Sequence, residues 1–81
     1  MSEHYKSVSC DFYDELENLA ILGKDCDISY WNENEVKITI RDRIKNLFAS
    51  GGIEWLETAN GLKIRLDKLI EVDRKRPYNQ C

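Results

Sequence analysis

The chain lacks the long apolar segments that would place it in or across a membrane. No run approaches the about 18 apolar residues that a spanning helix needs. The first residues also lack the apolar stretch that follows the basic start of a signal peptide. With one proline and four glycines in 81 residues, the composition is neither collagen-like nor that of a disordered chain. We therefore expect a cytoplasmic globular protein.

Cysteine and histidine are scarce. The three cysteines, Cys10, Cys26 and Cys81, are odd in number and widely spaced, which fits neither a disulfide framework nor the close pairs of a zinc site. We interpret them as free thiols, with Cys26 packing as a small apolar side chain. His4 is the only imidazole, and it lies in a segment without periodicity. A catalytic triad that depends on histidine is therefore not expected.

Other catalytic and metal-binding patterns are also missing. The clustered carboxylates fall on a predicted helix surface, where nothing buries one of them to raise its pKa for acid catalysis. No EF-hand spacing occurs, and Gly51-Gly52 lacks the context of a phosphate-binding loop. We predict a protein that is not an enzyme and has no cofactor and no metal.

The charge of the chain is unevenly distributed along it. The net charge is -3, but residues 1–35 contain nine acidic and two basic residues, whereas residues 36–81 contain six acidic and ten basic residues. An acidic segment of this kind is either a surface for a basic partner or a solvated face that keeps the protein soluble. Both interpretations stay open on charge alone.

A helix is predicted from Asp11 to just before Gly23. Ser9 or Asp11 can cap its first turn, and Gly23 is a typical stop. Such a short helix is unstable alone, so its apolar stripe must pack on another element. The stripe consists of Phe12, Leu16, Leu19 and Ala20.

After the helix the hydrophobic period changes to two, which is typical of strands. Residues 41–50 are charged and irregular, and we interpret them as a connector with one helical turn. Asn60-Gly61 supplies the positive φ angles of a tight hairpin turn. The predicted strands comprise residues 26–31, 36–41, 53–58, 62–66 and 68–72.

One helix and five short strands favour a small antiparallel barrel capped by the helix. The pattern alone does not separate Sm-like, SH3-like and OB barrels. Within the chain we predict an N-terminal tail at residues 1–9, a single domain at residues 10–73, and a C-terminal tail at residues 74–81.

Aromatic and basic side chains among the strands raise the possibility of RNA binding. However, a sequence pI of about 5.1 has the wrong sign for an affinity that depends on phosphate neutralisation. The tryptophans are also accounted for as barrel-filling side chains. We therefore expect no direct nucleic-acid partner. The residues concerned are Tyr13, Tyr30, Trp31, Trp55, Arg41, Arg43, Lys45, Lys63 and Arg65.

The outward side of the predicted helix is strongly acidic. It carries Asp11, Asp14, Glu15 and Glu17 with no intervening base, and Tyr13 interrupts the run. The self-repulsion of such a cluster costs only a few tenths of a kcal/mol per pair, so it is tolerated without any function. Protein binding and simple solvation both remain open for this face.

Two groups of residues resemble the Rho-binding antiterminator (Rof) family of bacteria. Residues 9–17 resemble that family's Cys-Asp-x-Tyr-Asp-x-Leu-Glu opening. Glu54-Trp55-Leu56 and residues 62–70 are similar to its Glu-Tyr-Leu and Arg-Leu-Asp-Lys-Ile segments, with Trp55 where the family often has tyrosine. The likeness covers most of the chain, whereas residues 41–52 match poorly.

This resemblance implies a five-stranded antiparallel Sm-like barrel with an N-terminal helix. It also implies that the chain binds the hexameric transcription termination factor Rho and inhibits Rho-dependent termination by occupying its RNA-binding region. The matching contact residues are Asp11, Tyr13, Asp14 and Glu17, and local geometry adds Glu15. The turn at residues 57–60 is a further candidate contact. We expect a monomer when free; the alternative is a small Sm-like RNA-binding barrel.

Overall fold

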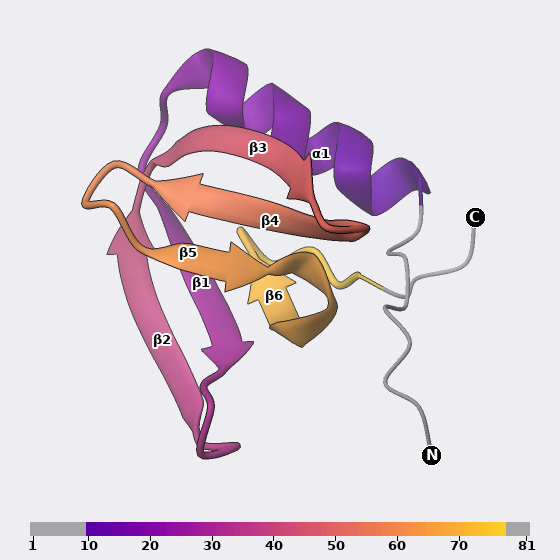
Figure 1. Cartoon of the computed structure of the whole chain (residues 1–81). Helices are drawn as coiled ribbons and strands as arrows, with labels where there is room; N and C mark the ends of the chain where they lie inside the picture. The colour runs from indigo at the N-terminus through magenta and orange to yellow at the C-terminus, as the bar shows by residue number, and fades with distance from the viewer. Residues whose placement is uncertain (1–9, 78–81) are drawn as a thin grey trace.

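The computed structural model describes residues 10–77 (Figure 1). One N-terminal helix is followed by six strands and one short 3₁₀ helix. Their bounds are α1 Cys10–Leu22, β1 Cys26–Trp31, β2 Lys37–Asp42, β3 Ile44–Ser50, β4 Ile53–Thr58, β5 Lys63–Arg65, η1 Leu66–Lys68 and β6 Leu69–Val72. This confirms the prediction of a mainly β domain with one N-terminal helix.

The strands form two antiparallel sheets of three strands each. Their orders are β2-β1-β6 and β3-β4-β5. A single residue, Arg43, separates β2 from β3, so one nearly continuous stretch of chain contributes to both sheets. No strand pairing within residues 10–77 closes the two sheets into a barrel. The observed strands also number six, because the predicted connector contains β3.

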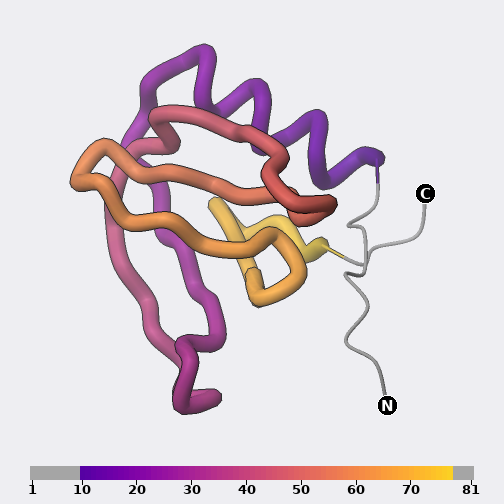
Figure 2. Tube along the Cα trace, in the orientation of Figure 1, coloured from indigo at the N-terminus to yellow at the C-terminus, as the bar shows by residue number. Residues whose placement is uncertain are grey.

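Helix α1 follows its predicted stripe. Phe12, Leu16 and Leu19 are buried in the core, and Figure 2 shows the helix lying along β3. The helix ends where Gly23 takes φ +62° and its N–H donates to the Leu19 carbonyl at 3.1 Å. Asp11 is wrong as an N-cap because it lies within the first turn. The other predicted cap, Ser9, is outside the described residues.

The predicted connector at residues 41–50 is wrong, since most of it is strand. The register of β3 against β4 shifts between Ile44 and Asn46, which leaves Lys45 as a β-bulge. Ile44 lies opposite Thr58, and Leu47 lies opposite Leu56; both of these partners face the core. Ile44 and Leu47 therefore lie on the same side of β3, although they are three residues apart. An extra residue in a strand breaks the alternation of period two. The sequence consequently looked irregular where the chain is extended.

The hairpin of β4 and β5 is confirmed, but its details differ from the prediction. Of the Asn60-Gly61 pair, only Gly61 has a positive φ, at +90°. Strand β5 ends at Arg65, since Leu66 begins η1. Buried Leu56 and Ile64 are paired across the hairpin and contribute to the core.

Asp42 fixes the corner between the two sheets. Its side chain is only 8% exposed. One carboxylate oxygen accepts from the Arg43 N–H at 2.8 Å, and the other accepts from the Asn60 backbone N–H at 3.2 Å and side-chain amide at 2.9 Å. Burial alone would raise the pKa of Asp42, but these hydrogen bonds and one from Thr58 outweigh it and hold the pKa below its usual value.

The core lies between the helix and the two sheets. Its buried side chains are Phe12, Leu16, Leu19, Cys26, Ile28, Ile44, Leu56, Ile64, Leu66, Leu69 and Val72. Cys26 is therefore confirmed as a small packed side chain. After β6, the Lys75 backbone bridges to Val72 and Pro77 is buried. The predicted N-terminal tail at residues 1–9 and the last part of the C-terminal tail, residues 78–81, lie outside the described residues.

Within residues 10–77, no helix has both the length and the apolar character needed to cross a membrane. The single α-helix has 13 residues and carries acidic side chains on its outer surface.

Candidate functional site

The predicted acidic residues lie on the outer side of α1. Because Phe12, Leu16 and Leu19 point into the core, the helical period turns Asp11, Asp14 and Glu17 outward, and all three are exposed. The two remaining candidates, Tyr13 and Glu15, are half-buried.

The helix carboxylates have no basic partner among the described residues. The ion pairs of residues 10–77 join Lys24 to Asp73, Arg41 to Asp27, Arg65 to Asp67 and Arg76 to Glu71. None of them includes an acid of α1. Consequently this face presents a negative charge that described cations do not neutralise at close range.

A groove of about 570 Å³ lies between α1 and β3. Tyr13, Asp14 and Glu17 line the helix side, and Lys45 and Leu47 line the strand side. The structure thus brings three of the five predicted contact residues together around one hollow. Asp11 and Glu15 do not line this groove.

The Tyr13 hydroxyl lies in an acidic environment. Burial raises the pKa of Tyr13, and the neighbouring charges of Glu54 and Glu17 raise it further. Glu54, in β4, was not predicted as part of the site. The signal was present in the sequence, because strand alternation places Glu54 on the same side of β4 as buried Leu56. The acidic surface therefore extends from the helix toward β4.

The C-terminal end of α1 exposes two large apolar side chains. Ile21 is 82% exposed and Leu22 is 69% exposed. Ile21 lines the groove beside α1 and lies one helical turn after Glu17. These residues were missed because only the buried stripe was considered, although their place outside that stripe was readable.

The predicted contact at residues 57–60 remains a prediction. Ala59 and Asn60 are exposed at the tip of the β4–β5 hairpin, whereas Glu57 is half-buried and opposite Lys63. Asn60 is also committed to Asp42 through two hydrogen bonds. Its side chain has less freedom to contact a partner than an unconstrained loop residue.

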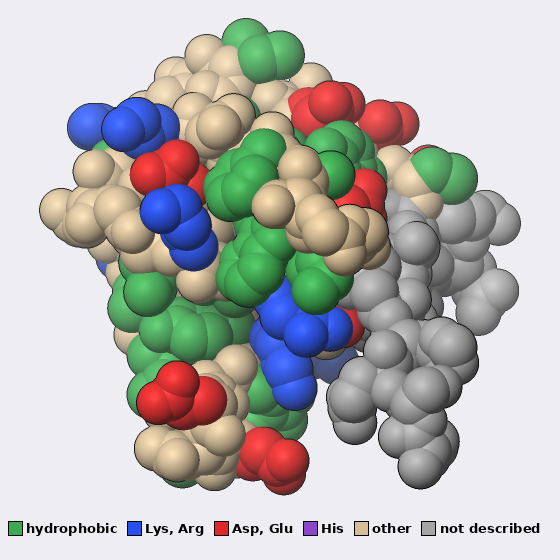
Figure 3. All heavy atoms as spheres, in the orientation of Figure 1, with side chains coloured by type: hydrophobic (Ala, Val, Ile, Leu, Met, Phe, Trp, Pro, Cys, Tyr) green, Lys and Arg blue, Asp and Glu red, His purple; other side chains and the backbone are tan. Residues whose placement is uncertain are grey.

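A second surface lies on the outer side of β3-β4-β5. Phe48 and Trp55 stack there, with ring centroids 6.5 Å apart and planes 12° apart, and Arg65 is opposite Trp55 in the register. Figure 3 shows hydrophobic side chains gathered over β4 and β5 with Lys or Arg side chains beside them. Trp31, on β1, is 45% exposed. The prediction that both tryptophans fill the interior is wrong, since neither belongs to the buried core.

Arg65 and Asp67 form an ion pair. Nε and an Nη of the guanidinium donate to the two carboxylate oxygens at 2.9 and 2.7 Å. A bidentate pair of this kind fixes both side chains. The pair holds the guanidinium at the end of β5, beside η1.

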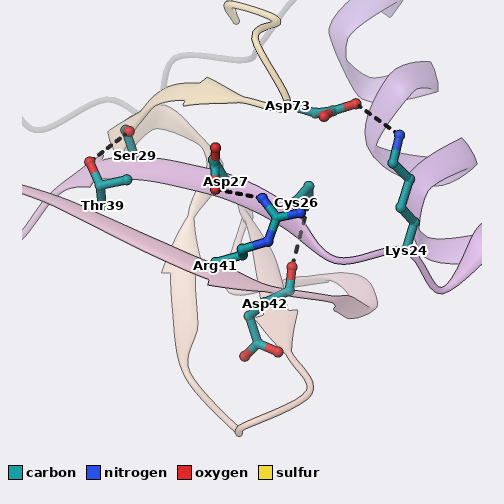
Figure 4. Close-up of polar contacts among 8 residues, drawn as sticks. All are labelled: Lys24, Cys26, Asp27, Ser29, Thr39, Arg41, Asp42 and Asp73. Atoms are coloured by element: carbon teal, nitrogen blue, oxygen red, sulfur yellow. Dashed lines mark hydrogen bonds and ion pairs between the residues drawn. The ribbon is translucent and has the colours of Figure 1, made fainter.

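Charged groups on the other sheet are largely paired internally (Figure 4). Arg41 donates to Asp27 across β1 and β2 at 3.0 Å, and Lys24 lies 3.9 Å from Asp73. Buried Cys26 contacts the Asp42 carbonyl at 3.5 Å, and burial followed by the charges of Asp73 and Asp27 raises its thiol pKa. A protonated buried thiol is a poor nucleophile.

In the part of the chain that the structure describes, no group of three or more His, Cys, Asp or Glu side chains is placed to hold a metal ion. His4 and Cys81 are outside that part.

The comparisons with protein-family models, with curated proteins and with solved structures gave no match.

Proposed function

We propose that the chain is a Rho-binding antiterminator of the Rof type. It binds the transcription termination factor Rho in the cytoplasm, as a monomer when free, and inhibits Rho-dependent termination by occupying the RNA-binding region. The resemblance of residues 9–17 and 62–70 to that family supplies the identity of the partner.

One observation carries the proposal: the α1 carboxylates have no basic partner among residues 10–77. A surface that binds RNA is basic and has pockets for planar bases. A rigid helix that presents carboxylates around the Tyr13 ring can occupy such a surface, because carboxylates form charge-assisted hydrogen bonds with arginine and lysine as phosphates do. Electrostatic complementarity of this type mainly increases the association rate and the specificity.

The Sm-like barrel is the finer part of the fold proposal. Its support is the chain order: α1 comes first, and β2 and β3 are separated only by Arg43. Counted as one sharply bent strand, β2 and β3 reduce the six strands to the five that the resemblance implies. An experimental structure with strand pairing between the free edges of the two sheets would demonstrate closure, and open edges there would contradict it.

Charge reversal tests the helix as the binding element. We expect Asp14→Lys combined with Glu17→Lys to reduce Rho capture at moderate salt by at least about tenfold, since attractive contacts become repulsive. Circular dichroism and the melting temperature should change little, because both side chains are exposed. Termination assays with purified Rho should show loss of the readthrough that the unmodified protein causes.

A matched control separates position from net charge. Asp25→Lys combined with Glu33→Lys makes the same charge change at two exposed positions outside α1. We expect this variant to capture Rho nearly as well as the unmodified protein. The helix mechanism is wrong if the helix variant still captures Rho, or if both variants lose capture equally.

A further inference from the structure

The outer face of β3-β4-β5 is defined by strand alternation. Leu56 and Ile64 are paired and buried, so their neighbours along β4 and β5 point to the opposite side. The side chains on this outer face are Asn46, Phe48, Trp55, Glu57, Lys63 and Arg65. Phe48, Trp55 and Arg65 therefore form one row across the three strands. A second row beside it consists of Asn46, Glu57 and Lys63.

Two indoles from different sheets line one groove beside this face. Trp31, at the end of β1, and Trp55, in the middle of β4, both line a groove of about 440 Å³. This volume is within the usual range of ligand sites. Trp31 keeps 45% of its surface exposed. An exposed indole is costly to hydrate and has a flat face on which another ring can stack.

The groove is locally basic although the chain is acidic. Lys63, Arg65 and Lys68 line it, against one acidic side chain, Glu33. The charge of Arg65 is balanced by Asp67, at 2.7 Å. Lys63 and Lys68 are exposed, and no ion pair among residues 10–77 includes them. Two ammonium groups are thus available to an anionic ligand at the edge of an aromatic surface.

We propose that this groove binds single-stranded RNA, with a base stacked on Trp31 or Trp55 and backbone phosphates beside Lys63 and Lys68. Single-stranded RNA combines flat rings with regularly spaced anions, which are the two features that the groove complements. An acidic peptide would match the lysines but would leave the indoles without a stacking partner. The acidic helix plays no part in this site.

This inference goes beyond the proposed function and does not depend on Rho. It also revises the expectation that the chain has no direct nucleic-acid partner. That expectation used the charge of the whole chain, whereas a phosphate close to the groove responds to nearby charges, because others are screened over about 10 Å at 0.1 M salt.

The test is an anisotropy titration of a fluorescein-labelled oligouridylate with the purified full chain, starting at about 0.1 M salt, where the distant acidic groups are screened. We expect saturable binding accompanied by quenching of tryptophan fluorescence. With two phosphates neutralised, the logarithm of the binding constant should fall with the logarithm of salt concentration with a slope of about -1.4, that is 0.7 for each phosphate on a single strand.

Variants assign the binding to the groove. Trp31→Ala should weaken RNA binding about tenfold, as expected from the stacking energy of one base, and Trp31→Phe should restore part of it. Lys63→Glu should weaken it severalfold. Lys45→Glu is the matched control, because Lys45 is an exposed lysine that lines the other groove, beside α1. It should bind RNA within about twofold of the unmodified protein, a small change in binding free energy.

Three results would overturn the proposal. The first is no saturable binding by the unmodified protein at about 0.1 M salt. The second is an equal loss in Lys63→Glu and Lys45→Glu, which would indicate only nonspecific attraction. The third is displacement of the RNA by polyglutamate as effectively as by unlabelled oligouridylate, which would indicate an acidic-peptide site. Because no Rho is present, failure here leaves the proposed function standing.

Discussion

The two surfaces of this small protein differ in both charge and chemistry. The outer side of α1 presents carboxylates that form no ion pair within residues 10–77, whereas the groove over β4 and β5 presents lysines beside two indoles. Yet the chain as a whole has a net charge of only -3. Net charge is therefore a poor guide to binding partners when the acidic and basic residues lie on different secondary-structure elements.

The difference arises from the two periodicities of secondary structure. A helix with three buried positions turns the intervening residues of the acidic segment outward together. Strands place alternate residues on one face, so Arg65 of β5 lines up with Trp55 of β4 and Phe48 of β3, and Lys63 lies on the same face. Each element therefore concentrates one kind of side chain that is dispersed in the sequence.

The largest effect is expected on stability, when the packing of α1 against the core is weakened. Leu16 is fully buried, so Leu16→Ala should lower the free energy of unfolding by about 3 kcal/mol, through lost burial and a residual cavity. Denaturant unfolding followed by circular dichroism measures this. Leu22→Ala is the control, since Leu22 is 69% exposed. Similar losses in the two variants would mean that α1 is not docked through the observed stripe.

Asp42, at the corner between the two sheets, should make the stability of the fold depend on pH. The pKa of Asp42 in the folded chain is below its ordinary value of 3.8, so ionised Asp42 stabilises the fold above that pH, and the contribution is lost as pH falls through the lower folded value. Asp42→Asn should lower the melting temperature by several degrees at pH 7. The difference between the two proteins should shrink below about pH 4.

Exposed Asp25 provides the comparison for that experiment. Asp25→Asn should leave the melting temperature nearly unchanged at both pH values. A difference between Asp42→Asn and the unmodified protein that stays constant from pH 7 to pH 3 would show that the carboxylate charge is not what holds the corner.

The independence of the two surfaces can be tested with paired variants. Asp14→Asn with Glu17→Gln should reduce Rho capture severalfold, since charge is removed rather than reversed, and should leave oligouridylate binding within about twofold. Trp31→Ala with Lys63→Glu should do the opposite. Both activities are measured on the same preparations. If either variant lost both activities while keeping its melting temperature, the two surfaces would have to act as one.

Removal of an ion pair outside both surfaces should have the smallest effect on stability and on binding. Arg41 and Asp27 pair at 3.0 Å, and both side chains are about two-thirds exposed. Arg41→Ala should therefore change the free energy of unfolding by less than about 1 kcal/mol. Neither Rho capture nor RNA binding should change. A larger loss of stability would show that the β1–β2 ladder depends on this exposed pair.

The sequence alone predicted those elements whose side chains follow a single, uninterrupted hydrophobic period. The apolar stripe of α1, its end at Gly23, and the two hairpins were predictable because each follows from local spacing and turn chemistry. The outward placement of the helix acids followed directly from that stripe. For the candidate site, Tyr13, Asp14 and Glu17 were found in advance, and the groove that they line required the packing of α1 against β3.

The rest depended on contacts between distant parts of the chain. The Asp42 hydrogen bonds to Asn60 join different elements, so no local pattern reveals them. Strand alternation indicates the side of β4 on which Glu54 lies, but its position near Tyr13 depends on how α1 packs. The two tryptophans were misplaced for a different reason. Trp31 follows Tyr30 and Trp55 precedes Leu56, so each alternates with a side chain that packs in or against the core, and the packing of the sheets fixes which side of the strand faces inward. In β3, the extra residue hid the phase that turns Phe48 outward.

That extra residue determines which ring reaches the solvent. If residues 44–50 alternated regularly, without the bulge at Lys45, the chain could keep either Ile44 or Leu47 inside, but not both. If Ile44 stayed inside, Phe48 would turn inward and its stacking with Trp55 would be lost. One unpaired residue thus lets two aliphatic side chains enter the core while the aromatic ring that follows them stays beside Trp55.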